Sequence, residues 1–213
     1  SKKRASMHLV RGDATLASMR RDGIEPLDVD YAAFKQTLVG ENHTLKRSLT
    51  DPDLFSGIVN AYSDEILHAA KLSPVRLTQK MDDTEIRRLY DATRSTLTWW
   101  IEHLRAETGD EWPAKVPAFR PEMATHGKFG KPCPVCGTKI QRIVHAENET
   151  NYCPGCQTGG KLLADRGLSK LLHGDWPKSI EEMELRKEAA RGSLPLDADG
   201  DTHAALATTK RVE

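Results

Sequence analysis

The residues best suited to chemistry are the chain's four cysteines. They form two Cys-x-x-Cys pairs, Cys133 with Cys136 and Cys153 with Cys156, and sixteen residues separate the pairs. Zn²⁺ prefers a tetrahedron of ligands such as thiolates, and each pair offers two sulfurs from one tight turn. The spacing therefore predicts one structural zinc ion bound by all four cysteines. A disulfide pairing, an iron–sulfur cluster and a rubredoxin-type iron site are alternatives that spacing alone leaves open.

The residues around the cysteines indicate how the pairs are held. Pro134 and Pro154 stiffen the two turns, and Gly137 and Gly155 supply backbone freedom beside or inside them. A strand-forming run over residues 140–144 lies between the pairs. This arrangement predicts a small β-hairpin zinc finger.

Composition indicates a cytoplasmic protein. The chain has 213 residues, enough for one large or two small domains, and is 38% hydrophobic and 29% charged. It contains no apolar run near the roughly 18 residues that cross a bilayer, and no signal-peptide region. Cysteines arranged as metal ligands fit a reducing compartment.

Charge is unevenly distributed although the formal net charge is zero. Residues 128–178 contain eight Lys and Arg against four Asp and Glu, a net charge of +4. Residues 179–213 contain five against eight, a net charge of −3. The basic excess around the cysteines predicts contact with a phosphate backbone.

The hydrophobic pattern is mainly helical. The longest predicted helix begins at a cap on Asp82 or Asp83 and ends near Arg105, and its apolar residues recur at three- and four-residue spacing. Trp99 and Trp100 in this helix are expected in the core. Shorter helices are expected over residues 31–39, 42–49, 51–55, 61–71, 168–172 and 179–191, and residues 3–10 could form a single strand.

Three segments carry a resemblance to a known family. Residues 42–52, 54–67 and 132–157 resemble the formamidopyrimidine-DNA glycosylase and endonuclease VIII family of base-excision repair enzymes. In that family the first two segments form a helix–two-turns–helix module and the third a zinc-finger hairpin, which together hold DNA opposite an N-terminal β-sandwich. The resemblance implies a mainly α fold, a helical bundle with this module plus a small β-hairpin zinc finger, and an N-terminal sandwich that is largely missing.

The resemblance also implies a domain organisation. Residues 1–27 would be a remnant strand of the N-terminal domain and a connector, and residues 28–110 the helix–two-turns–helix domain. Residues 111–127 would be a linker, 128–160 the zinc finger, and 161–213 a partly disordered C-terminal extension.

The residues expected to contact DNA follow from the same resemblance. Lys46 matches a family lysine at the damaged strand, and Asn60 a phosphate contact, although Asn60 could instead be an ordinary helix cap. The family's finger carries an arginine where this chain has Asn148. An amide offers less to a phosphate than a guanidinium does. Either Lys139 and Arg142 supply the cation or the finger binds DNA less tightly, and Arg142 is expected to substitute in part.

Two further family matches are expected to be structural. Tyr62 is interpreted as a packing residue and Glu65 as part of the helix surface. No catalytic residue is assigned, because the family's N-terminal proline amine and adjacent glutamate have no counterpart in Ser1-Lys2-Lys3.

Two functions fit these patterns. The chain could bind damaged DNA as the C-terminal part of a base-excision-repair DNA glycosylase and AP lyase acting on oxidised bases. It could instead be a stand-alone, zinc-stabilised, non-catalytic DNA-binding module. In both cases the expected partner is double-stranded DNA containing damaged bases or abasic sites, bound by a monomer without a membrane. A zinc ribbon for protein–protein contact is a third interpretation.

Overall fold

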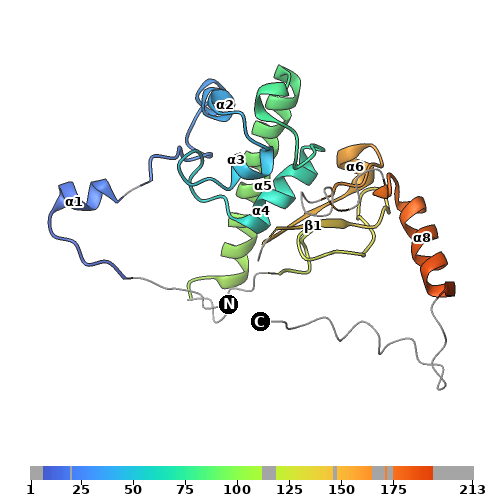
Figure 1. Ribbon diagram of the computed structural model, residues 1–213. Helices are drawn as coiled ribbons and strands as arrows, with labels where there is room; N and C mark the ends of the chain where they lie inside the picture. Colours follow the sequence, from blue (N-terminus) through green and yellow to red (C-terminus); the bar gives the residue numbers. More distant parts are fainter. Residues whose placement is uncertain are drawn as a thin grey trace, which may run out of the picture. The chain divides into compact units, whose positions relative to one another are not determined.

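The chain folds into two compact units, residues 1–165 and 166–213. The computed structural model describes residues 7–19, 21–111, 119–145, 148–164, 171 and 175–193 (Figure 1). Within these residues no helix is both long and apolar enough to span a bilayer.

The first unit is mainly helical and carries one small hairpin, as the sequence predicted. Its elements are, in order, α1 (Asp13–Ser18), α2 (Tyr31–Gly40), α3 (Leu45–Leu49), α4 (Asn60–Ala69), the 3₁₀ turn η1 (Thr78–Lys80), α5 (Asp83–Thr108), β1 (Gln141–His145), β2 (Asn148–Tyr152) and α6 (Pro154–Thr158). The second unit contains α8 (Ile180–Ser193).

Local capping sets where α2 and α5 begin. The Asp30 side chain accepts a hydrogen bond from the N–H of Ala33 and caps α2. Asp82 and Glu85 form a reciprocal capping box at the start of α5. The predicted caps and the predicted long helix are therefore confirmed, and α5 extends to Thr108.

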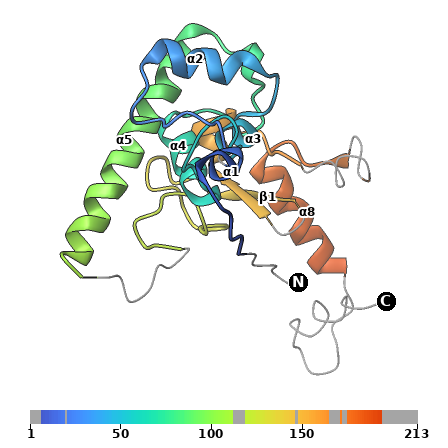
Figure 2. The same cartoon turned by 90° about the vertical axis from the view of Figure 1, so that its left-hand side faces the viewer.

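The hydrophobic core lies among α2, α3, α4 and α5. Its buried side chains include Phe34 and Leu38 of α2, Leu49 of α3, Ile66 of α4 and Leu89 of α5. Helix α4 is the shared element, because it contacts α3 and α5 on the helical side and β2 and α6 of the finger on the other. Figures 1 and 2 show α4 among these elements. The helical bundle and the finger are thus joined by one ten-residue helix.

The finger is built on an antiparallel hairpin. Gln141 pairs with Tyr152 at its base, and His145 pairs with Asn148 at its tip. Ile140, directly before β1, is completely buried. Ile140 packs with Cys133 and Cys153 in a cluster far smaller than the helical core.

Several helix expectations differ in detail. The helix expected over 42–49 begins only at Leu45, and residues 52–54 form turns instead of a helix. Helix α1 and helix α6 were not predicted, and residues 7–10 form no strand. The helix expected over 179–191 is confirmed as α8, where the Ser179 hydroxyl accepts from the N–H of Glu182.

The two tryptophans of α5 differ in burial. Trp100 is buried, as expected, but the side chain of Trp99 is 48% exposed, so its placement in the core was wrong. Adjacent residues on a helix point about 100° apart, and the ring of Trp100 packs against Tyr62 of α4. The expected strand over 3–6, most of the helix over 168–172 and the tail after Ser193 lie outside the described residues.

Candidate metal centre and nucleic-acid interface

Both cysteine pairs sit in short turns fixed by backbone hydrogen bonds. The carbonyl of Cys133 accepts from the N–H of Gly137, whose φ of +73° suits a residue without a Cβ. Cys153 caps α6, and its Sγ accepts from the N–H of Cys156. Pro154 occupies the first turn of α6, where no hydrogen bond is lost by its missing N–H. These local rules bring the thiols of the two pairs close together.

The sulfur atoms are spaced for a tetrahedral metal. Sγ of Cys133 lies 3.9 Å from Sγ of Cys156, and Sγ of Cys136 lies 3.3 Å from Sγ of Cys153. Zinc–sulfur bonds of about 2.3 Å place neighbouring sulfurs of a tetrahedron about 3.8 Å apart. The donor set therefore fits a structural zinc ion.

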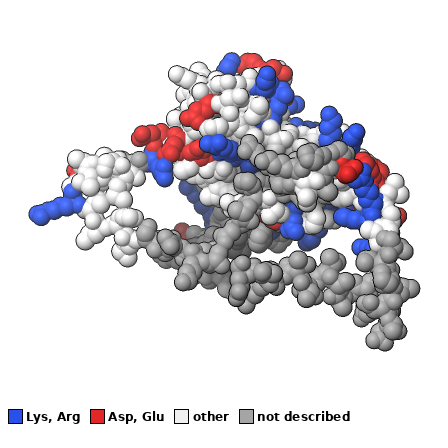
Figure 3. All heavy atoms as spheres, in the orientation of Figure 1, with Lys and Arg blue, Asp and Glu red and all other residues white. Residues whose placement is uncertain are grey.

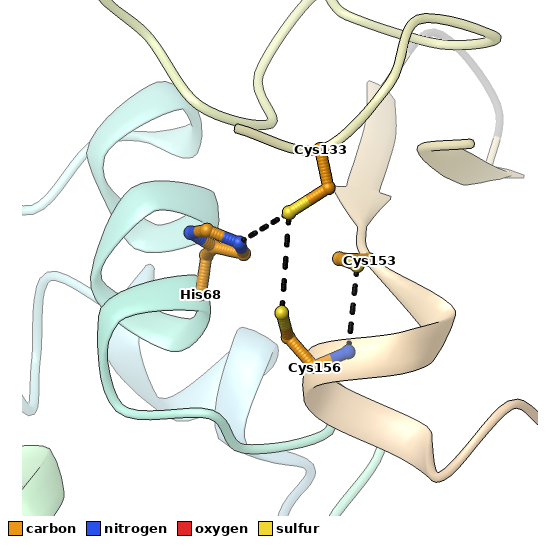
Figure 4. A group of neighbouring side chains, drawn as sticks. All are labelled: His68, Cys133, Cys153 and Cys156. Carbon is orange, nitrogen blue, oxygen red and sulfur yellow. Dashed lines mark hydrogen bonds between the residues drawn. The ribbon is translucent and has the colours of Figure 1, made fainter. Parts of the chain in front are cut away.

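One residue from outside the finger reaches this cluster. Nε2 of His68, on α4, lies 3.2 Å from Sγ of Cys133. The potential ligand atoms of His68, Cys133, Cys153 and Cys156 all lie within 4.8 Å of one another. Figure 4 shows the imidazole of His68 directed from α4 toward Cys133. No local pattern in the sequence associates His68 with the cysteines, because sixty-five positions separate it from Cys133.

The thiols differ in acidity in the metal-free protein. Hydrogen bonding to Thr138 lowers the pKa of the Cys136 thiol to about 6. Burial raises the pKa of Cys156 to about 11 and raises the pKa of Cys153 as well. Zinc binds the thiolate form, so zinc binding must displace protons from Cys153 and Cys156.

A buried carboxylate of α4 ties the helical module to the finger. Asp64 is completely buried, and Lys46 Nζ donates to its Oδ1 at 2.5 Å. Its Oδ2 accepts from the backbone N–H of Asn151 at 3.1 Å and lies 2.8 Å from Nδ1 of His126. Burial lowers the pKa of Lys46, although the charge of Asp64 opposes that shift. A fully buried carboxylate needs such partners, because an unpaired charge is costly away from water.

The neighbouring carboxylate holds the segment that precedes the finger. Glu65 Oε1 accepts from the N–H groups of Thr125 and His126, and Oε2 accepts from the N–H of Ala124. The expectation that Glu65 lies on the helix surface was therefore wrong, since it is only 7% exposed. Residues 124–126 cover this side of α4 and supply the N–H donors that make burial of Glu65 possible. The interpretation of Tyr62 as a packing residue is confirmed.

Asn60 and Lys46 meet at the start of α4. Asn60 is the first residue of the helix, and its Nδ2 donates to the carbonyl of Glu149 in β2 at 3.0 Å. Val59 occupies the cap position and makes no capping hydrogen bond, so Asn60 is not an N-cap. Lys46 Nζ donates to the Asn60 carbonyl at 2.8 Å, and its side chain is only 14% exposed.

The predicted finger residues lie along the hairpin. Arg142 donates to Glu149 across the strands at 3.0 Å, and its guanidinium lies 4.5 Å above the ring of Phe129. Asn148 is exposed at the start of β2, and Lys139 is exposed two residues before β1. Arg142, Phe129 and Asn148 line an open depression of about 720 Å³. The structure thus brings Arg142 and Asn148 together and places Asn60 against Glu149, the residue next to Asn148 in β2.

Surface charge is mixed on one face of the described residues. Lys and Arg side chains intermingle with Asp and Glu on the face shown in Figure 3. This agrees with the formal net charge of zero. On this face, a contact with phosphate would rest on particular side chains and helix ends.

Two family models match the chain. The formamidopyrimidine-DNA glycosylase H2TH domain matches residues 23–109, and the zinc finger found in FPG and IleRS matches residues 130–159. These matches cover the helical core and the cysteine cluster respectively.

The chain is also similar to curated proteins of this kind. An uncharacterized formamidopyrimidine-DNA glycosylase-like protein of Mycobacterium tuberculosis is 38% identical over 150 residues, which are 70% of this chain and 93% of that protein. A formamidopyrimidine-DNA glycosylase of Thermus thermophilus is 36% identical over 157 residues, which are 70% of this chain and 59% of that enzyme. The chain thus spans little more than half the length of the relatives that carry the glycosylase name.

Solved structures give the same picture. The crystal structure of the MutM (FPG) protein from Thermus thermophilus matches with a TM-score of 0.56 and 34% identity, over 69% of this chain and 58% of that one. A complex between Lactococcus lactis Fpg and DNA containing an abasic site matches with a TM-score of 0.54 and 27% identity, over 68% of this chain and 54% of that one.

Proposed function

The chain belongs to the formamidopyrimidine-DNA glycosylase family and carries its helix–two-turns–helix and zinc-finger region, and we propose that it binds double-stranded DNA containing damaged bases or abasic sites. The observation that carries this proposal is the 3.0 Å hydrogen bond from Asn60 to the Glu149 carbonyl. Through it the start of α4 and the finger hairpin form one continuous surface, which one duplex can contact at both elements.

The start of α4 is suited to a phosphate. No side chain caps this helix, so its first N–H groups are open to an external acceptor. The amide of Asn60 has two N–H groups and uses one on Glu149, which leaves the other for a phosphate oxygen. Lys46 donates to the Asn60 carbonyl, and its charge is paired with the buried carboxylate of Asp64. Lys46 therefore acts on DNA chiefly by holding Asn60.

The direct test is binding to labelled duplexes by fluorescence anisotropy. We expect tighter binding to a duplex with an abasic-site analogue than to an intact duplex. The logarithm of affinity should fall with the logarithm of salt concentration by about 0.9 for each phosphate contacted. Asn60→Ala should weaken binding, whereas Gln36→Ala, an exposed amide on α2, should not. If zinc-loaded protein bound neither duplex at low salt, the result would instead support the interpretation as a zinc ribbon for protein–protein contact.

The role of this region in catalysis has two candidates. Similarity to enzymes named formamidopyrimidine-DNA glycosylase supports a role as the C-terminal part of a base-excision-repair glycosylase and AP lyase acting on oxidised bases. Coverage of 93% of the mycobacterial relative supports a stand-alone, non-catalytic DNA-binding module, because that relative extends little beyond the matched region.

Borohydride trapping on abasic-site DNA tests whether these 213 residues carry an amine nucleophile. An amine that attacks C1′ of the abasic sugar forms a Schiff base, which borohydride reduces to a stable adduct. We expect DNA binding without an adduct. A trapped complex would show that an amine of this chain is a nucleophile and would exclude the non-catalytic module.

A further inference from the structure

His68 is the residue of the helical module that approaches the zinc site. Its imidazole is buried on α4, with 7% of its surface exposed, and Nε2 lies 3.2 Å from Sγ of Cys133 (Figure 4). Cys133 is also buried, with 3% exposed. A buried thiolate has lost its hydration and is stabilised by any N–H group that can donate to it.

His68 could in principle be a ligand or a donor to a ligand, and the finger itself favours the second role. Cys136 Sγ lies 3.3 Å from Cys153 Sγ, so it points into the cluster. A Cβ on Gly155 would come within 3.0 Å of Cys136 Sγ, which shows that Cys136 is packed against the second turn. The two Cys-x-x-Cys pairs offer the four thiolates that a structural zinc ion takes, so Nε2 of His68 is left to contact the sulfur of Cys133.

We propose that His68 is a positioning residue that donates its Nε2–H to the zinc-bound thiolate of Cys133. The hydrogen bond orients this sulfur and reduces the excess negative charge of four thiolates around one divalent ion. It also fastens α4 to the first cysteine pair, at a point separate from the contacts of Asp64 and Glu65. Zinc thereby stabilises the junction between the finger and the helical module as well as the finger itself.

Two substitutions distinguish donation from packing. His68→Leu keeps an apolar side chain in the site but removes the donor, and His68→Gln keeps an N–H group near the position of Nε2. Competition with a chromophoric chelator should show zinc affinity about tenfold lower for His68→Leu and within about twofold of the original for His68→Gln. Unchanged zinc affinity in His68→Leu would overturn the proposal.

Cobalt spectroscopy tests the ligand set. Cobalt-substituted protein should show the absorption of a four-sulfur site, and the same spectrum in both His68 variants. A spectrum of three sulfurs and one nitrogen that changes in both variants would show that His68 is a ligand and would also overturn the proposal.

Leu67→Ala serves as a matched control for loss of stability. Leu67 neighbours His68 on α4 and is buried in the helical core. Its truncation should lower the unfolding temperature while leaving the zinc affinity of folded protein close to the original. An equal loss of zinc affinity in Leu67→Ala and His68→Leu would attribute the effect to weakened packing and reject donation. None of these measurements depends on DNA, so failure here is separable from failure of the proposed function.

Discussion

The roles of some side chains could be predicted from neighbouring residues in the sequence, and the roles of others could not. The metal-binding role of the four cysteines was predictable because both members of each pair lie within four residues of sequence. The roles of Asp64, Glu65 and His68 were not, because their partners in the finger and in residues 124–126 lie about sixty or more positions away along the chain. In the sequence, the feature that indicated their burial was their position beside the apolar residues Ile66 and Leu67. The structure shows that residues 63–68 of α4 are all buried.

Glu65 should contribute strongly to stability. Glu65→Gln preserves the size of the side chain but turns an amide NH₂ toward backbone N–H groups that now donate to a carboxylate. Leaving one buried N–H unpaired and weakening the others should lower the free energy of unfolding by about 2 kcal/mol. Urea unfolding measures this change, and Glu102→Gln, on an exposed part of α5, should alter it by less than about 0.5 kcal/mol. Equal stabilities of the two variants would contradict the assignment.

Arg142 is the finger cation whose position can be tested on DNA. It is exposed enough to contact phosphate and is held in place by Glu149 and the ring of Phe129. Arg142→Ala should weaken DNA binding and reduce the slope of log affinity against log salt by about 0.9. Arg88→Ala, an exposed cation on α5, is the control and should leave the slope unchanged. An unaltered slope in Arg142→Ala would show that Arg142 does not replace the arginine expected at Asn148.

Whole helices were predicted where apolar residues recur at helical spacing and a capping residue marks the start of the helix. Helix α5 satisfies both conditions, since its apolar stripe is regular and Asp82 begins it. Helix α6 was missed because Cys-Pro-Gly-Cys was interpreted only as a metal-binding turn, although Pro154 and the Cys153 cap also begin a helix. Residues 52–54 failed as a helix because Asp51 caps a turn, accepting from the N–H of Asp53, in place of a longer element.

The packing of the two cysteine turns can be tested through Gly155. A Cβ at this position would lie 2.6 Å from Thr138 Oγ1 and 3.0 Å from Cys136 Sγ. Overpacking of about 1–3 kcal/mol should lower zinc affinity by about tenfold or more in Gly155→Ala. Gly40→Ala is the control, because nothing lies within 4 Å of its added Cβ, and it should leave zinc affinity unchanged. Equal zinc affinities in the two variants would show that the turns can move apart freely.

Over the whole first unit, the two modules differ in what stabilises them. The helical module has a core contributed by four helices, whereas the finger's own buried cluster contains only Cys133, Ile140 and Cys153 among the described residues. A cluster of that size cannot offset the entropy of ordering the hairpin, so metal binding must supply the difference.

Zinc removal should therefore unfold the finger and spare the helices. After treatment with a strong chelator, amide signals of β1 and β2 should lose dispersion in a ¹H–¹⁵N correlation spectrum, while those of α2 and α5 should persist. Readdition of zinc should restore them. Signals of β1 and β2 that survive complete zinc removal would show that contacts with α4 are sufficient to hold the hairpin.

The contacts made by α4 also couple the substitutions that the protein can tolerate at α4 and in the finger. A substitution at Asp64 removes the carboxylate that both His126 and Asn151 contact. A substitution that displaces either of those residues leaves the buried Asp64 carboxylate with one partner fewer. A chimaera that receives only a foreign finger inherits mismatched partners along α4, whereas one that receives α4 together with that finger inherits a matched set. We therefore expect a transplanted finger to pack correctly only when α4 is transferred with it.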